Sequence, residues 1–134
     1  MHVYNTGRVA DAVTRRLRGF VPHWRDLTTR DARVQAETIA KDRLHALVEL
    51  SGLTTGHSLP ALALRPAPLQ ISWLGYAGAT RCPFIDARIA DSLTDPEAAD
   101  PSDRVVRLDP CFLCYLPPKV APAQRSVDPA RIRF

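Results

Sequence analysis

The chain has 134 residues, of which 46% are apolar and 24% charged, values that suit one compact domain and exclude a disordered tail. No apolar run reaches the roughly 18 residues that a membrane helix needs, and residues 1–5 do not resemble a secretory signal. The three cysteines, an odd number, favour free thiols in a reducing compartment. We therefore expect a cytoplasmic protein with no membrane contact.

The basic residues give a net charge of +4 and are almost all arginine, because Lys41 and Lys119 are the only lysines. A nucleic-acid-binding domain gathers its basic residues on one face or in one stripe of its surface. Here the arginines are scattered along the chain and alternate with Asp and Glu. The pattern indicates solvated helix faces, so we expect no nucleic-acid partner.

The N-terminal region predicts a strand, a helix and a second extended segment. The side chains of residues 1–6 alternate in character as in a strand. Because this strand would lie at the very start, we expect the chain to begin inside a larger fold. Residues 8–20 predict a helix that Pro22 ends, and 23–27 a strand or connector. The apolar residues expected to face inward from the helix are Val9, Val13, Leu17 and Phe20.

A helix, a strand and a glycine-containing loop follow in that order. Asp31, close to Thr28 and Thr29, predicts the start of a helix that runs to about Asp42. Its inward residues are expected to be Val34, Ile39 and Ala40. Residues 44–50 form a short apolar run typical of a buried strand, and the polar loop 51–56 comes next. This order is one unit of a parallel α/β sheet.

The second half predicts one short helix and three strands. In chain order these are residues 58–65, 69–74, 84–90 and 104–108. The strand at 69–74 has the clearest alternation and places Trp73 on its buried face. A second glycine-bearing loop, 75–80, follows it, residues 95–101 form a polar turn, and residues 117–134 form a proline-rich linker.

The two glycine-bearing loops, 51–56 and 75–80, each follow a predicted parallel strand. Loops at the carboxyl edge of an open α/β sheet are where ligands bind, because they can present backbone N–H groups to a phosphate or sugar. Neither loop carries a GxGxxG or Walker sequence. The position therefore predicts a ligand edge without identifying the ligand.

Residues 64–78, LRPAPLQISWLGYAG, closely resemble the RPAPVQVSWLGYPG segment of the O-linked N-acetylglucosamine transferases, which include SPINDLY-like members. Three further stretches resemble the family's LVDLSGHTAG, MDYRLTD and RLPGGFLCYRPP segments in the same order and spacing. They are residues 47–56 (LVELSGLTTG), 85–91 (IDARIAD) and 107–118 (RLDPCFLCYLPP).

The resemblance implies a GT-B glycosyltransferase, with two Rossmann-like lobes facing across a cleft and usually preceded by tetratricopeptide repeats. Such an enzyme transfers N-acetylglucosamine from UDP-GlcNAc to Ser or Thr hydroxyls of proteins, with inversion and with no metal or other cofactor. Residues 1–116 would then be part of the N-terminal lobe and the start of the insert, and 117–134 a linker towards the second lobe. The expected partners are a nucleotide sugar, a protein acceptor and a second lobe, which a separate chain could supply.

The family's motifs place two loops of this chain at the cleft. The LGYPG-like loop borders the donor sugar in the family, and the GHT-like loop lies near sugar and acceptor. The substrate-binding residues implied by this resemblance are Gly52, Leu53, Thr54, Leu74, Gly75, Ala77 and Gly78.

Several positions depart from the family pattern. Leu53 stands where the family has His or Tyr, Ala77 where it has Pro, and Ala79 where it has Thr or Ser; Arg81 replaces a Gly and Ala87 a Tyr. The family's histidine in an NHPTSHL-like segment would lie upstream of this sequence, and its UDP-binding residues in the second lobe. We therefore assign no catalytic residue and expect the chain alone to be inactive. The alternative is a degenerate, non-catalytic interaction module that retains the fold.

For the cysteines the sequence indicates structural roles. Cys111 and Cys114 form a CxxC, but a zinc site needs two more ligands and only Cys82 and His57 are at hand. Phe112 and Leu113, between the two cysteines, are expected in the core. We predict no metal site.

The remaining titratable residues lack partners for acid–base chemistry. His45 lies in an apolar run and is expected to be structural, and His57 follows the first loop without a placed partner. Asp86 and Asp91 are expected to cap strand edges, and Arg65 to form an ion pair.

Overall fold

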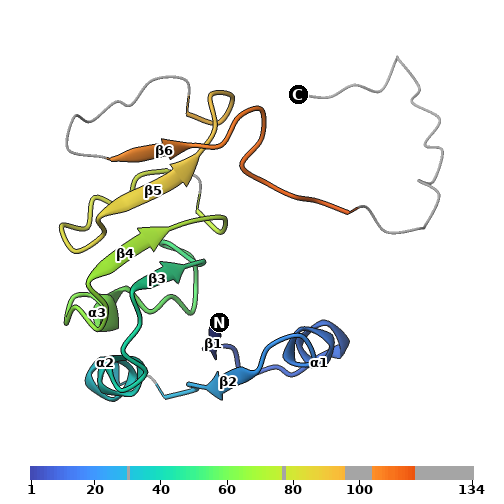
Figure 1. Ribbon diagram of the computed structural model, residues 1–134, viewed down its shortest axis with the longest axis vertical. Helices are drawn as coiled ribbons and strands as arrows, with labels where there is room; N and C mark the ends of the chain where they lie inside the picture. The colour runs from blue at the N-terminus through green and yellow to red at the C-terminus, as the bar shows by residue number, and fades with distance from the viewer. Residues whose placement is uncertain (30, 77, 96–103, 117–134) are drawn as a thin grey trace, which may run out of the picture.

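The computed structural model describes residues 1–29, 31–76, 78–95 and 104–116. The elements in chain order are β1 (His2–Asn5), α1 (Ala12–Arg18), β2 (His23–Asp26), α2 (Ala32–Ala40), β3 (Ala46–Glu49), α3 (Leu59–Leu62), β4 (Leu69–Ser72), β5 (Ala87–Ala90) and β6 (Val105–Arg107). They form parallel strands, with a helix between consecutive strands as far as β4 and no helix between β4, β5 and β6 in the described residues (Figure 1).

The strands form two sheets, and every pair in them is parallel. β1 pairs with β2, and the other sheet has the order β3-β4-β5-β6. The α/β prediction with Rossmann-like parallel strands is confirmed. Because β3 and β4 are neighbours that run in the same direction, the loops that follow them emerge at the same edge.

Helix α2 packs against α3, and its Ile39 is buried in one cluster with Leu47 of β3. Its first turn is capped by Asp31, as predicted, which accepts hydrogen bonds from the N–H groups two and three residues later. Ile39 is buried, but the expected burial of Val34 and Ala40 is wrong. Gln35 takes the inward place instead, because its Nε2 donates to the Thr29 carbonyl at 2.7 Å and satisfies the buried amide.

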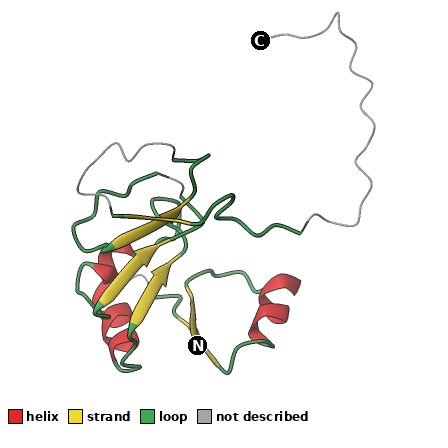
Figure 2. Cartoon of the chain, turned by 45° about the horizontal axis from the view of Figure 1, so that its top comes forward, coloured by secondary structure: helices red, strands yellow, loops and turns green. Residues whose placement is uncertain are grey.

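Helix α1 is shorter than predicted, and its expected inward face is exposed. Asp11 caps the helix by accepting the Thr14 N–H, so the helix starts at residue 12 instead of 8. Figure 2 shows α1 beyond the two-stranded sheet, away from α2 and α3. None of its residues is buried. The four apolar residues predicted to face inward are between 51% and 76% exposed: Val9, Val13, Leu17 and Phe20.

One apolar cluster connects the two sheets. Its buried members are Leu27, Ile39, Leu47, Leu62 and Ala67. Tyr4 packs against this cluster and donates its hydroxyl to Asp42 Oδ2 at 2.6 Å. The β1–β2 pair is therefore attached to the rest of the fold through side chains, since no strand pairing between the two sheets occurs among the described residues.

No helix in the described part of the chain is both long and apolar enough to cross a bilayer.

The different environments of two leucines give a first prediction. Leu62→Ala removes a 2%-exposed side chain from the cluster and should lower the free energy of unfolding by about 2–5 kcal/mol. The matched change Leu17→Ala, on the exposed face of α1, should change it by less than about 0.5 kcal/mol. Urea denaturation followed by circular dichroism measures both. Equal losses would show that the α1 face is packed and that this description of it is wrong.

Candidate functional site

The two glycine-bearing loops meet directly at the carboxyl edge of β3 and β4. The Gly75 N–H donates to the Leu50 carbonyl at 3.0 Å, and the Trp73 N–H donates to the Glu49 carbonyl at 2.9 Å. The ladder between the two strands therefore continues past their ends. The predicted juxtaposition of the loops is confirmed.

Glycine is required where the loops touch. A Cβ atom on Gly75 would lie 2.2 Å from the Leu50 carbonyl oxygen, which is backbone and cannot turn aside. Gly52 has a φ of +56°, and a Cβ there would lie 2.3 Å from the Tyr76 Cβ. The backbone of each loop therefore fits against the other with no room for a side chain.

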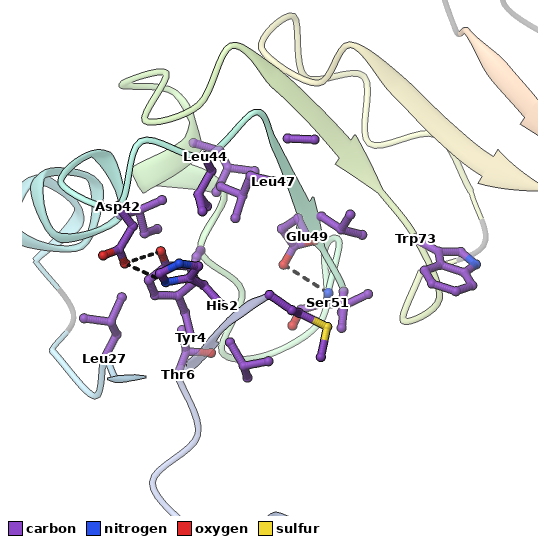
Figure 3. Close-up of a pocket in the computed structure, with 18 of the residues that line it drawn as sticks. His2, Tyr4, Thr6, Leu27, Asp42, Leu44, Leu47, Glu49, Ser51 and Trp73 are labelled. Carbon is purple, nitrogen blue, oxygen red and sulfur yellow. Dashed lines mark hydrogen bonds and ion pairs between the residues drawn. The ribbon is translucent and has the colours of Figure 1, made fainter. Parts of the chain in front are cut away.

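A buried carboxylate shapes the first loop. Glu49, the last residue of β3, accepts the N–H of Ser51 at 3.0 Å and of Gly52 at 2.5 Å (Figure 3). Sequence reasoning missed Glu49, although a lone acidic residue between an apolar strand and a glycine loop was a usable signal. Because Glu49 occupies these two N–H groups, they are not available to a phosphate.

The residues outside this contact form the open surface of the loops. Leu53 and Thr54 are exposed, and the Thr54 hydroxyl donates to the Ser51 carbonyl at 2.7 Å. On the second loop Leu74 is half-buried with a φ of +73°, a conformation that non-glycine residues rarely adopt. Gly78 is exposed beside the Tyr76 ring.

The structure thus brings together all the predicted substrate-binding residues that it describes. They are Gly52, Leu53, Thr54, Leu74, Gly75 and Gly78. Ala77 lies outside the described residues. That these residues contact a sugar stays a prediction.

Trp73 was expected in the core, but the structure places it elsewhere. It follows the last residue of β4, is half-buried, and donates its indole N–H to the Phe112 carbonyl at 3.1 Å. The strand ends at residue 72, so the alternation that predicted an inward Trp73 no longer applies. Phe112 is buried as expected, whereas Leu113 is 47% exposed.

Asp91 is buried and connects three segments. It accepts the N–H groups of Leu93 at 3.0 Å, Thr94 at 2.7 Å and Phe112 at 2.9 Å. The bonds from the Phe112 and Thr94 N–H groups lower the pKa of Asp91 to about 2. It therefore caps the end of β5 and also holds the segment around Phe112 in place.

Arg65 forms the ion pair expected of it. Its Nη1 lies 2.9 Å from Asp86 Oδ1, and Asp86 also accepts the Gln70 N–H at 2.7 Å. The Arg65 hydrogen bond, followed by that from Gln70, lowers the pKa of Asp86. The pair fixes the start of β4 and lies at the edge opposite the loops.

The cysteines and histidines form no metal-binding cluster in the part of the chain that the structure describes. Cys111 and Cys114 are exposed free thiols, and no three potential ligands among the described residues lie close enough for a metal. His57 Nδ1 accepts the Leu59 N–H at 3.3 Å. His45 is exposed, so the structural role expected for it does not include burial.

The contact between the loops can be tested with two glycines of the same loop. Gly75→Ala places a methyl group against the Leu50 carbonyl and should lower the free energy of unfolding by about 1–3 kcal/mol. Gly78→Ala is the control, because its Cβ would meet only the end of the Tyr76 ring, at 3.2 Å. Urea denaturation should place Gly78→Ala within about 0.5 kcal/mol of the wild type. A Gly75→Ala protein of wild-type stability would contradict the close contact.

Asp91 predicts a pH dependence of stability. A carboxyl whose pKa is lower in the folded than in the unfolded chain adds stability above about pH 4, and this is lost as the pH falls to about 2. Asp91→Asn removes this contribution, so the difference in free energy of unfolding between wild type and variant should shrink as the pH falls over that range. Denaturation midpoints at about pH 6 and about pH 2.5 measure it. A difference that stays constant with pH would contradict the assignment to Asp91.

Comparisons with known proteins agree with the motifs and the fold. The sequence model of Glycosyl transferase family 41 matches residues 11–111. The chain is 40% identical over 127 residues to the probable UDP-N-acetylglucosamine–peptide N-acetylglucosaminyltransferase SPINDLY of Arabidopsis thaliana, covering 90% of the chain and 14% of that relative. The Petunia hybrida SPINDLY protein of the same description is 37% identical over 134 residues, covering 96% of the chain and 14% of that relative.

A solved structure matches as well. A mutant of the Thermobaculum terrenum O-GlcNAc transferase superposes with a TM-score of 0.80 at 34% identity, covering 90% of this chain and 24% of that chain. The chain therefore spans about a seventh of the length of its curated relatives and about a quarter of the solved enzyme. With its motifs, its parallel α/β fold and the match over most of its length, the chain belongs to glycosyl transferase family 41.

Proposed function

We propose that the loops after β3 and β4 form the sugar-facing wall of the N-terminal lobe in an enzyme that transfers N-acetylglucosamine from UDP-GlcNAc to Ser or Thr hydroxyls of proteins. The observation that carries the proposal is the direct contact between the loops after β3 and β4. The relatives described as UDP-N-acetylglucosamine–peptide N-acetylglucosaminyltransferases support the donor and the acceptor class.

The loops would act through shape rather than through charge. Glu49 uses the Ser51 and Gly52 N–H groups, and Leu50 uses that of Gly75. The surface left open presents the Thr54 region and the exposed backbone of Gly75 and Gly78, which suits an uncharged sugar better than a diphosphate. The diphosphate would be held by other parts of the catalytic region.

Transfer needs more than this wall. An inverting transferase must hold the acceptor and the donor in line and stabilise charge on the leaving diphosphate. In the described part of the two loops the Glu49 carboxylate is committed to loop N–H groups, and His57 Nδ1 to the Leu59 N–H. We therefore propose that the 134-residue chain alone does not turn over UDP-GlcNAc and requires a second lobe, in the same or in a separate polypeptide.

The same proposal covers the organisation and setting of the chain. Residues 1–116 would belong to the N-terminal lobe and the start of the insert, and 117–134 would connect towards the second lobe. The partners would be a nucleotide sugar and a protein acceptor, in the cytoplasm.

A second candidate is a non-catalytic interaction module, favoured by one observation. Leu53, which replaces the family's His or Tyr, is 50% exposed at the tip of the first loop, where an apolar side chain suits a protein contact better than a hydroxyl-rich sugar.

Titration of the isotope-labelled chain with UDP-GlcNAc separates these candidates. We expect saturable shifts of the Gly52, Thr54, Gly75 and Gly78 amide signals with a dissociation constant on the order of millimolar, because only one wall of the site is present. Signals from the exposed side of α2 should not move. UDP alone should leave the loop signals unchanged, because the loops face the sugar. Equal shifts with UDP would contradict the sugar-facing assignment, and no shift with UDP-GlcNAc would favour the interaction module.

The proposed lack of turnover is measured separately. The purified chain incubated with UDP-GlcNAc and a Ser-containing peptide should release no UDP and form no glycopeptide above the level of a protein-free control. Release of UDP that rises with chain concentration would show that the chain is a competent enzyme by itself.

A further inference from the structure

Two cysteines lie three residues apart in the short segment that follows β6 (Figure 1). Cys111 and Cys114 were expected to have structural roles, but both are exposed free thiols, and only Phe112 between them is buried. A thiol that solvent can reach is open to oxidants, whereas a buried one is inert. We call Cys111 and Cys114 the thiol pair.

The residue between the two thiols is bonded to the carboxyl edge of the sheet. The Phe112 N–H donates to Asp91, which follows β5, at 2.9 Å, and the Phe112 carbonyl accepts the indole N–H of Trp73, which follows β4, at 3.1 Å. Trp73 directly precedes Leu74 and Gly75 of the second glycine-bearing loop. The thiol pair therefore lies at the same edge as the candidate site and is connected to it by a hydrogen bond.

The chain is anchored before the thiol pair and unattached after it. The Asp109 carboxylate accepts the Ser92 N–H at 2.8 Å and the Ser92 hydroxyl at 2.9 Å. Residues 113–116 make no hydrogen bond within the described part of the chain, and all four are exposed. Cys111 is thus held in place, whereas Cys114 lies in a stretch that can move at little cost.

Closure of a disulfide within the thiol pair needs only a small movement of the backbone. The two Cα atoms must come to about 5.5–6 Å from one another, compared with about 10 Å across a fully extended stretch of this length. The chain already bends at Phe112, so Leu113 and Cys114 have only part of that distance to move. The peptide between Phe112 and Leu113 is the central peptide of the turn that closure forms, and it carries the carbonyl bonded to Trp73.

We propose that Cys111 and Cys114 are a redox modification site, which a low-molecular-weight disulfide such as glutathione disulfide oxidises to an intrachain disulfide, and that closure of this disulfide breaks the hydrogen bond from Trp73 to Phe112. In a reducing compartment the dithiol is the resting form. The inference goes beyond the proposed function and does not depend on donor binding.

The oxidation takes place by two thiol–disulfide exchanges. The Cys111 thiolate attacks one sulfur of glutathione disulfide, which forms a mixed disulfide and releases one glutathione thiolate. The Cys114 thiolate then attacks the Cys111 sulfur, which forms the intrachain bond and releases the second glutathione thiolate. The two protein thiols lose two electrons and two protons, and one glutathione disulfide becomes two molecules of glutathione.

The test treats the full 134-residue chain with glutathione buffers of increasing oxidised-to-reduced ratio and traps the remaining thiols by alkylation. Trypsin cleaves after Arg107 and Lys119, so the thiol pair falls in peptide 108–119 and Cys82 in peptide 82–88. Peptide 108–119 should lose two hydrogens and take up no alkylating agent. Cys82 should be at least about tenfold less oxidised in the same buffer, because no thiol three residues away displaces glutathione from it.

The two tryptophans report what closure does to the structure. Trp73 donates its indole N–H to the Phe112 carbonyl, and Trp24 donates its own to Asp26 Oδ1 at 2.9 Å in the other sheet. In the isotope-labelled chain, oxidation should shift the indole signal of Trp73 and the amide signal of Gly75, and should leave the indole signal of Trp24 unchanged. Excess dithiothreitol should restore the starting spectrum.

Two serine variants separate closure from simple modification. Cys114→Ser keeps the first exchange and removes the second, so glutathione should stay attached to Cys111 and the Trp73 signal should not move. Cys82→Ser is the control and should oxidise like the wild type, because Cys82 is not part of the thiol pair. Both changes replace one sulfur by oxygen, and circular dichroism checks that the variants are folded.

Three results would overturn the proposal. They are a thiol pair that stays reduced in a buffer that attaches glutathione to Cys82, a disulfide that includes Cys82 or joins two chains, and closure that leaves the Trp73 signal unchanged. The titration with UDP-GlcNAc is carried out on the reduced chain, so its outcome is independent of these results and failure of either proposal can be recognised separately.

Discussion

The approach of one backbone to another at Gly75 is the constraint on which the site depends. The Gly75 nitrogen donates its N–H to the Leu50 carbonyl oxygen at 3.0 Å. A Cβ atom on Gly75 would lie only 2.2 Å from that same oxygen. Any other residue would separate the two loops. Because β3 and β4 are parallel and adjacent, this single contact converts two independent turns into one surface.

Carboxylates that accept backbone N–H groups two and three residues later shape the chain at three places. Asp31 does so at the start of α2, Glu49 after β3 and Asp91 after β5. At Asp31 the result is a helix cap, and at the two strand ends it is a tight turn. The fold thus uses the same local interaction to begin a helix and to end strands at the edge where the candidate site lies.

The strands could be predicted because their signal is local. The apolar run around β3 and the alternation of β4 place each strand within a few residues of its observed bounds. The motif in residues 64–78 identified the family, and with it the pair of loops. Each of these inferences depends on a short stretch of sequence and not on what packs against it.

The errors arose where packing between distant segments decides the outcome. The apolar stripe of α1 has the spacing of a buried face, yet nothing in the described chain covers it. Trp73 lies one residue beyond the end of β4, and its indole reaches a carbonyl 39 positions later. Glu49 was missed although its place between an apolar strand and a glycine loop was a usable signal, because its two hydrogen bonds depend on how the next loop folds.

The central claim, that the two loops form one surface, is tested most directly by scalar coupling across the hydrogen bond between the Gly75 nitrogen and the Leu50 carbonyl carbon in the labelled protein. The account predicts a measurable coupling, together with a nuclear Overhauser contact between the Gly52 α-protons and the Tyr76 β-protons. A Gly75 amide that exchanges freely with solvent and shows no such coupling would contradict it.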